Sequence, residues 1–376
     1  MSSRHTVRTW FAATLVVALA GCAIERRPDE APASPAEVRA RIVALLPSNL
    51  SDRAGWAADY QAAFAALDVV PTLPNLCAAL AITEQESSYR ADPSVPNLPK
   101  IAREEIDRRA TRVGVPAFAV RAALQIGSPD GRTYAERLDA VRTEKELSAI
   151  YEDFIGMVPM GRRLFAGWNP VRTGGPMQVG IAFAERHAKQ RRYPYPMSGT
   201  VRDEVFTRRG GLYFGIAHLL DYPASYDRHL YRFADFNAGR YASRNAAFQS
   251  AVSLLSGIPL ELDGDLVRHD GGDAAPGSTE FAVRALGQRL GIGDASIRQA
   301  LEQGEDAAFE RSALYARVFE LADRLEHRPV PRAVIPRIAL KGPKITRQLT
   351  TGWFANRVDE RHRRCIARGE AATLRP

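Results

Sequence analysis

Apolar side chains recur every three or four residues along most of this 376-residue chain, which is the periodicity of helices that bury one face. Trp56, Tyr60 and Phe64 show this spacing clearly, whereas the alternating pattern of a half-buried strand is scarce. The sequence therefore predicts a mainly α protein. With 45% hydrophobic and 25% charged residues, the composition excludes a disordered or fibrous chain.

The first 22 residues have the layout of a bacterial lipoprotein signal. Arg4 and Arg8 precede an apolar stretch too short to span a bilayer, and the segment Leu19-Ala20-Gly21-Cys22 resembles a lipobox. We therefore expect lipidation of Cys22, which anchors the chain to a membrane without spanning it. A plain signal peptide with an incidental cysteine is the alternative. Because Ala23 rather than Asp follows, the resemblance favours the outer membrane, facing the periplasm.

Two further cysteines, Cys77 and Cys365, remain in the mature chain. Export to an oxidising compartment permits a disulfide between them. Two separate small residues are the alternative, and the sequence does not decide between the two. Three cysteines in all cannot build a disulfide scaffold.

The positive charge of the chain is concentrated in its tail. Residues 328–376 carry twelve Arg or Lys against three acids, a net charge of +9, whereas the whole chain has +8. Removing Arg4 and Arg8 leaves +6, so the rest of the mature chain has 6 − 9 = −3. An exported protein meets no nucleic acid, so we expect anionic cell-wall polymer or lipid headgroups as partners of the tail. A merely solvated surface is the alternative.

Breaks in the helical pattern give the expected organisation. It comprises a signal peptide (1–21), a tether (22–35), N-terminal helices (36–71), a helical core (72–257), C-terminal helices (258–327) and a basic, proline-containing tail (328–376). Within these regions we expect helices over residues 35–46, 51–68, 76–89, 178–190, 201–220, 223–235 and 240–257, and loops at 166–177 and 258–276, the second solvated.

Three short segments of the core carry the features of a catalytic site. They are Glu86-Ser87-Ser88-Tyr89-Arg90, Gly174-Gly175-Pro176-Met177-Gln178 and Asp235-Phe236-Asn237-Ala238-Gly239. In this order they resemble the lytic transglycosylases with a lysozyme-like fold. In that family a Glu-Ser pair ends a buried helix, a Gly-Leu-Met-Gln loop follows, and an Ala-Tyr-Asn-Ala-Gly stretch closes the site. The resemblance covers roughly residues 72–257.

The resemblance implies cleavage of the MurNAc–GlcNAc bond of peptidoglycan by one glutamate, giving 1,6-anhydromuramoyl ends, without cofactor or metal. Glu86 would be the catalytic residue, and Ser87 would orient the N-acetyl group. Met177 and Gln178 would line the cleft beside the scissile sugar. The loop that positions the glycan would contain Phe236, Asn237 and Gly239. Core packing for Met177 and a helix-end turn for Ser87 are the alternatives.

The position of Glu86 on its helix supports an acid role independently. Leu76, Ala79, Leu80 and Thr83 form one buried stripe, and Glu86 continues it at the helix end. Poor solvation and the negative end of the helix dipole both disfavour the carboxylate and raise its pKa. A raised pKa suits a general acid. A surface position paired with Arg90 is the alternative.

A hydrolase normally needs a second carboxylate. Only Asp92 and Asp235 are candidates, and neither has motif support, which favours a transglycosylase. The chain departs from the family in Pro176 and Phe236, which replace Leu and Tyr, and in a helical insertion between residues 87 and 176. A non-catalytic peptidoglycan-binding domain and a structural lipoprotein that positions other envelope proteins are therefore the competing hypotheses.

Overall fold

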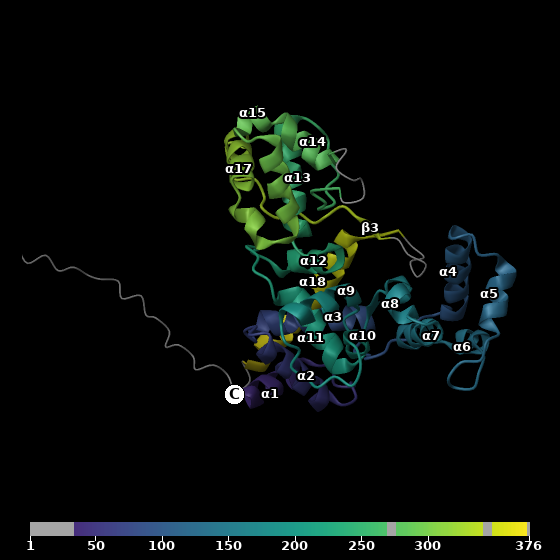
Figure 1. Cartoon of the computed structure of the whole chain (residues 1–376). Coiled ribbons are helices and arrows are strands. Elements are labelled where there is room, and N and C mark those ends of the chain that lie inside the picture. The colour runs from purple at the N-terminus through teal and green to yellow at the C-terminus, as the bar shows by residue number, and fades with distance from the viewer. Residues whose placement is uncertain (1–33, 269–275, 341–347, 374–376) are drawn as a thin grey trace, which may run out of the picture. The chain divides into compact units, whose positions relative to one another are not determined.

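The computed structural model describes residues 34–268, 276–340 and 348–373, and the chain from Pro35 onward forms one compact unit (Figure 1). It is mainly helical, which confirms the predicted fold class. The helices are α1 (Pro35–Leu45), α2 (Arg53–Ala66), α3 (Leu73–Ser87), α4 (Leu98–Arg112), α5 (Ala117–Leu124), α6 (Tyr134–Ala140), α7 (Glu144–Gly156), α8 (Gly161–Phe165), α9 (Ile181–Gln190), α10 (Val201–Val205), α11 (Arg208–Leu220), α12 (His229–Ala238), α13 (Ala242–Ser256), α14 (Ser278–Ala285), α15 (Gly287–Leu290), α16 (Asp294–Leu301), α17 (Ala313–Glu326) and α18 (Thr351–Thr373).

Strands are few and short. In the described residues β1 (Thr173–Gly174) pairs antiparallel with β2 (Val179–Gly180), and β3 (Ala339–Leu340) pairs with β4 (Leu349–Thr350). The first pair turns the expected 166–177 loop into a small hairpin, so α9 begins at Ile181 rather than at 178.

Capping side chains determine the first residues of several helices, which the spacing of apolar residues predicted only approximately. The Thr72 hydroxyl accepts a hydrogen bond from the Asn75 amide, so α3 begins three residues before the expected Leu76. The Thr207 hydroxyl likewise accepts from the Gly210 amide and starts α11. The single helix expected over 201–220 is therefore two helices.

Helix α11 is the centre of the main hydrophobic cluster. It packs against α2, α3, β2, α9, α10 and α12. All its residues from Gly210 to Ala217 are buried, because three glycines among large apolar side chains let neighbouring segments approach. A second cluster forms between α13 and helices α14, α16 and α17.

The tail contains a long helix, α18, that the sequence analysis did not predict. Its buried residues Phe354, Val358 and Cys365 form one helical stripe against α3 and α12. Cys365 is bonded to Cys77 of α3, with an S–S distance of 1.99 Å and a Cα–Cα distance of 5.5 Å. The structure therefore contains the disulfide that the sequence left undecided.

Part of the tail's positive charge is neutralised within the fold. Arg361 and Arg364 lie 3.3 and 3.5 Å from the Glu84 carboxylate, and Arg363 lies 3.0 Å from Asp359. The proline-containing segment before α18 runs along the body, where the Val334 amide donates to the Ser243 carbonyl at 3.0 Å.

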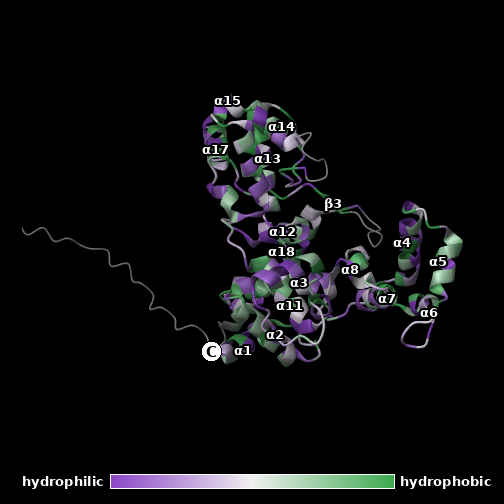
Figure 2. Cartoon of the chain, viewed as in Figure 1, coloured by the Kyte–Doolittle hydropathy of each residue, from purple (hydrophilic) through white to green (hydrophobic). Residues whose placement is uncertain are grey.

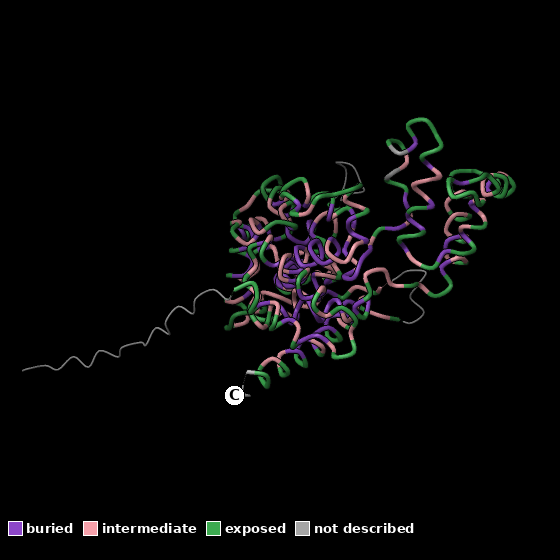
Figure 3. Tube along the Cα trace, turned by 90° about the horizontal axis from the view of Figure 1, so that it is seen from below, coloured by how far each residue is buried: buried purple, intermediate pink, exposed green. Residues whose placement is uncertain are grey.

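The insertion between the first two motif segments folds as helices α4 to α8, which pack mainly on one another. The Val95 amide donates to the Arg142 carbonyl at 2.9 Å and so ties its beginning to its middle. Figure 3 shows the buried trace concentrated in the main body, whereas these helices, to the right as in Figure 1, are largely intermediate or exposed.

We expect loss of the disulfide to destabilise the whole fold, because it joins residues separated by 288 positions. The Cys77→Ser, Cys365→Ser double variant should lose about 2–5 kcal/mol of unfolding free energy, measured by urea denaturation. Wild-type protein in reducing buffer should match it. Equal stability of the oxidised protein and the double variant would contradict the assignment.

Candidate functional site

Two of the three motif segments contact helix α11 directly, and the first approaches it through Trp56. A Cβ atom on Gly215 would lie 2.5 Å from the Met177 sulfur, and one on Gly211 would lie 2.4 Å from Pro176 Cδ. The third segment meets the end of the helix, where His218 Nε2 lies 3.3 Å from the Phe236 carbonyl oxygen.

The first segment reaches the beginning of α11 through Trp56. The Tyr89 ring packs edge-on against Trp56 at 5.8 Å, and the Arg208 guanidinium lies 5.4 Å from the Trp56 ring. The three segments therefore lie near the beginning, the middle and the end of α11 in their sequence order, the first of them one aromatic ring away from the helix. From Arg208 to His218 this helix rises about 15 Å.

Glu86 lies in the last turn of α3 and is half-buried. The helix below it is buried on every side from Leu76 to Thr83, and the Thr83 hydroxyl accepts a 2.6 Å hydrogen bond from Tyr60. Ser87 is buried, and its hydroxyl donates to the Thr83 carbonyl at 3.0 Å and accepts from the Arg90 amide at 3.2 Å. Ser87 thus makes the helix-end contacts of the alternative interpretation.

Met177 and Gln178 form the tip of the β1–β2 hairpin. Met177 is fully buried against α11, the position that its core-packing alternative describes. Gln178 has a positive φ of 50°, and its side-chain amide donates to the Gly175 carbonyl at 3.2 Å. Its side chain is only half-buried, so it can still contact a ligand beside the hairpin.

The third segment ends α12. Phe236 is half-buried, with its ring 5.1 Å from His218, and Asn237 is exposed but accepts a 2.8 Å hydrogen bond from the Thr351 hydroxyl of α18. Gly239 has a φ of 113°, and no heavy atom lies within 4 Å of its missing Cβ. Backbone conformation, rather than crowding, therefore requires a glycine at this position.

Asp235 has a structural role. Its carboxylate is 1% exposed and accepts hydrogen bonds from the Tyr226 hydroxyl (2.7 Å), the Ser243 amide (2.7 Å) and the Tyr241 amide (3.0 Å). Burial raises its pKa, and these donors oppose the rise. The carboxylate stabilises the α12–α13 turn. Because it is buried and its oxygens accept these hydrogen bonds, it is not available as a second base.

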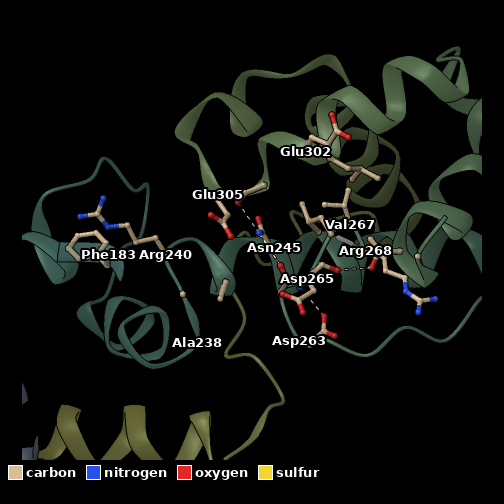
Figure 4. Close-up of a pocket in the computed structure, with 18 of the residues that line it drawn as sticks. Phe183, Ala238, Arg240, Asn245, Asp263, Asp265, Val267, Arg268, Glu302 and Glu305 are labelled. Carbon is tan, nitrogen blue, oxygen red and sulfur yellow. Dashed lines mark hydrogen bonds between the residues drawn. The ribbon is translucent and has the colours of Figure 1, made fainter. Parts of the chain in front are cut away.

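A polar cavity of about 700 Å³ adjoins the third segment. One wall comes from α9, the end of α11 and residues 238–240, and the other from residues 263–268, the start of α14 and the end of α16. Figure 4 shows Phe183 and Arg240 on the first side, and Asp263, Asp265 and Glu305 on the second. We call it the interlobe cavity because it lies between the two hydrophobic clusters.

The sequence did not predict this cavity, because the polar pattern of residues 258–276 indicated a solvated loop. In the described part, the Gln249 side chain donates to Asp263 at 2.7 Å, and the Asn245 amide donates to the Gly264 carbonyl at 3.0 Å. Two buried polar side chains on α13 therefore fix the loop against the body. Polar residues on a helix otherwise buried, such as Asn245 and Gln249, were the available signal.

His218 lies between the Phe183 and Phe236 rings, with centroid distances of 4.6 and 5.1 Å, and lines the interlobe cavity. Burial lowers its pKa to about 3. Among the described residues its Nδ1 atom, which is buried, has no hydrogen-bond partner. The folded state therefore favours the neutral imidazole.

The described residues contain neither a group of metal-ligating side chains nor a membrane-spanning helix. Within the described ranges, His, Cys, Asp and Glu side chains do not gather into groups of three that could hold a metal ion. Over the same part of the chain, every helix falls short of the length and apolar character that a membrane crossing requires. Cys22, the expected lipidation site, lies outside the described residues.

Fold and site together define a mainly helical protein with a disulfide-closed core and a polar cavity beside α11. The chain belongs to the family described as "Protein of unknown function (DUF1615)", which matches residues 49–368. It is 55% identical over 352 residues to "Uncharacterized protein YaiW" of Escherichia coli (strain K12), which covers 93% of this chain and 96% of that protein. No solved structure matches the chain.

The contact between Met177 and α11 should tolerate no added methyl group. We expect Gly215→Ala to lower the unfolding free energy by about 1–3 kcal/mol, because the new Cβ would overlap Met177. Gly352→Ala is the control, since its Cβ would meet nothing closer than 3.6 Å. Urea denaturation of both variants tests this, and equal stabilities would refute the close packing.

The lowered pKa of His218 predicts acid sensitivity. A depressed pKa contributes stability that is complete above about pH 6.5 and is lost as the pH falls toward about 3. His218→Gln should therefore reduce the slope of unfolding free energy against pH, between pH 6 and 4, by up to about 1.4 kcal/mol per pH unit. His327→Gln, at an exposed helix end, is the control and should keep the wild-type slope.

Proposed function

We propose that this protein is a lipid-anchored, periplasmic envelope protein that binds peptidoglycan glycan strands at the three motif segments and cleaves them as a lytic transglycosylase, with Glu86 as its catalytic residue. The observation that carries the proposal is the placement of three distant segments along one helix in the order of the resemblance. In the proposal, Glu86, the hairpin and the third segment contact one strand.

The proposed chemistry needs a single carboxyl group. Glu86 donates its proton to the glycosidic oxygen as the bond from C1 of MurNAc breaks, while the N-acetyl oxygen stabilises the developing positive charge. The Glu86 carboxylate then takes the proton of the C6 hydroxyl, whose oxygen bonds to C1 and forms the 1,6-anhydro ring. No water is consumed. The structural role of Asp235 is consistent with a mechanism that uses no second carboxylate.

Two features support the proposed location and substrate. The disulfide between Cys77 and Cys365 is typical of chains exported to an oxidising compartment. The interlobe cavity offers guanidinium, amide, hydroxyl and carboxylate groups next to Gly239, and such groups suit a sugar polymer. A membrane anchor at Cys22 and partners among envelope proteins belong to the same proposal.

Binding without cleavage is the second candidate, and a specific observation favours it. The Ser87 hydroxyl and the Asn237 amide oxygen, two of the groups expected at the sugar, are hydrogen-bonded within the chain. Met177 is fully buried. In this case the three motif segments would hold the glycan strand, and Glu86 would not catalyse its cleavage.

We expect residues 23–376 to release anhydro-muropeptides from purified peptidoglycan, and Glu86→Gln to reduce the rate about 100-fold or more, because the proton donor is removed. Mass spectrometry of the soluble products is the measurement. Glu84→Gln is the matched control: it lies on the same helix but pairs with Arg361 of α18, and it should cleave like the wild type.

Sedimentation with intact sacculi separates the two candidates. Anhydro products from wild type and Glu84→Gln, but not from Glu86→Gln, would support the transglycosylase. Products with reducing ends would show hydrolysis instead. Sedimentation of all three proteins without any product would support the binding function, and neither product nor sedimentation would overturn both candidates.

A further inference from the structure

A second cavity, of about 520 Å³, lies in the helical insertion and takes no part in the proposed function. Helices α4, α5, α6 and α7 and the segment from Trp168 to Val171 surround it. All but four of its lining residues are apolar or aromatic; the four are Glu105, Arg108, Arg109 and Glu144. We call it the apolar cavity. Its volume is in the usual range for small-molecule sites.

The insertion also exposes an unusual amount of apolar surface. Of the fifteen large hydrophobic residues exposed among the described residues, nine lie between Val113 and Trp168. Phe118 on α5 is 69% exposed, and Figure 2 shows α5 coloured as largely hydrophobic. Exposed apolar patches of this kind mark sites that contact a ligand, a membrane or another protein.

The mouth of the apolar cavity combines apolar and basic groups. Val113 and Val115 line the cavity and are 54% and 41% exposed, so the α4–α5 turn borders its opening. On the preceding turn of α4, one carboxylate, Glu105, pairs with both Arg108 and Arg109. The group of Glu105, Arg108 and Arg109 therefore carries one net positive charge at this border, whereas Glu144, the other acidic residue of the lining, lies on α7.

Trp168 completes the opening. Its side chain lines the cavity and is 54% exposed, while its carbonyl oxygen accepts a hydrogen bond from Arg109. The opening therefore carries both an exposed tryptophan and a basic residue bonded to its backbone, and these two residue types are typical of surfaces that meet lipid headgroups. A sugar would leave its hydroxyl groups without partners in so apolar a lining, and water is poorly held there for the same reason.

We propose that the apolar cavity binds the hydrocarbon chain of a long-chain fatty acid, with the carboxylate held at the Arg108–Arg109 border. The chain fills the apolar space between α4 and α7, and the anionic head meets the surplus positive charge. The proposal is independent of peptidoglycan cleavage, because Glu86 does not line this cavity.

The test uses residues 23–376, which contain the compact unit, and radiolabelled palmitate as the probe. We expect saturable binding at one site, with affinity rising about tenfold for every two methylene groups added between C10 and C16. Ala123→Trp, which fills the cavity, should weaken binding at least about tenfold. Ala122→Trp is the matched control: the neighbouring residue on α5 is exposed and does not line the cavity, so binding should stay within about twofold.

Two further measurements keep the result interpretable if Ala123→Trp disturbs the fold. Brominated palmitate should quench the fluorescence of Trp168, and Trp168→Phe should lose this component of the quenching. Arg109→Gln should weaken palmitate about tenfold and leave hexadecanol, which has no charge, unchanged. Arg121→Gln, an exposed α5 residue that does not line the cavity, is its control and should bind palmitate normally.

Several outcomes would overturn the proposal. They are equal palmitate binding by wild type and a folded Ala123→Trp, quenching that persists unchanged in Trp168→Phe, and absence of saturable binding. Concentration-dependent self-association that palmitate does not reverse would show instead that a second copy of the chain covers this surface. Measured Glu86-dependent cleavage, or its absence, leaves the proposal unaffected.

Discussion

Close approach to helix α11 is the constraint on which the rest of the structure depends. The hairpin carrying Met177 reaches this helix only because Gly211 and Gly215 have no side chains there. Glycine in a helix interior destabilises the helix by about 1 kcal/mol relative to alanine. Glycines in α11 are therefore explained by the close approach of a neighbouring segment. The same helix receives α3 and α12 on other faces, and it thereby fixes the relative positions of the three segments of the candidate site.

The end of α12 shows a second kind of constraint, which is electrostatic rather than steric. Asp235 is removed from water, and its pKa rises for that reason, yet two tyrosine hydroxyls and two backbone amides converge on it. A buried acceptor with this many donors fixes the geometry of a turn more strictly than apolar packing does. The exposed Asn237 and the interlobe cavity both adjoin this turn, so a rigid support underlies the part of the surface that faces solvent.

Helices with a clear apolar stripe could be predicted from the sequence, and α1, α2 and α13 lie within a few residues of the expected positions. Helix α18 could not, because its stripe is narrow and most of its residues between Asn356 and Arg364 are charged. It packs against α3 and α12, which lie more than a hundred residues away in the sequence, so no local sequence pattern predicts this helix. The candidate site divides in the same way. Short motifs identify its segments, and the contacts of Ser87 are local to the helix end. The burial of Met177 and the hydrogen bond from Thr351 to Asn237 arise only from the tertiary fold.

Helix α18 also determines when the fold can be completed. The residues of α18 that cover α3 and α12 lie more than a hundred residues later in the chain, so they are synthesised after both helices. A chain that stops before Thr351 would leave the apolar faces of both helices uncovered and Cys77 without its partner. Contacts of such long sequence separation form slowly, because a large loop must close first. A chain without α18 would therefore expose apolar surface of the kind that proteases and chaperones recognise.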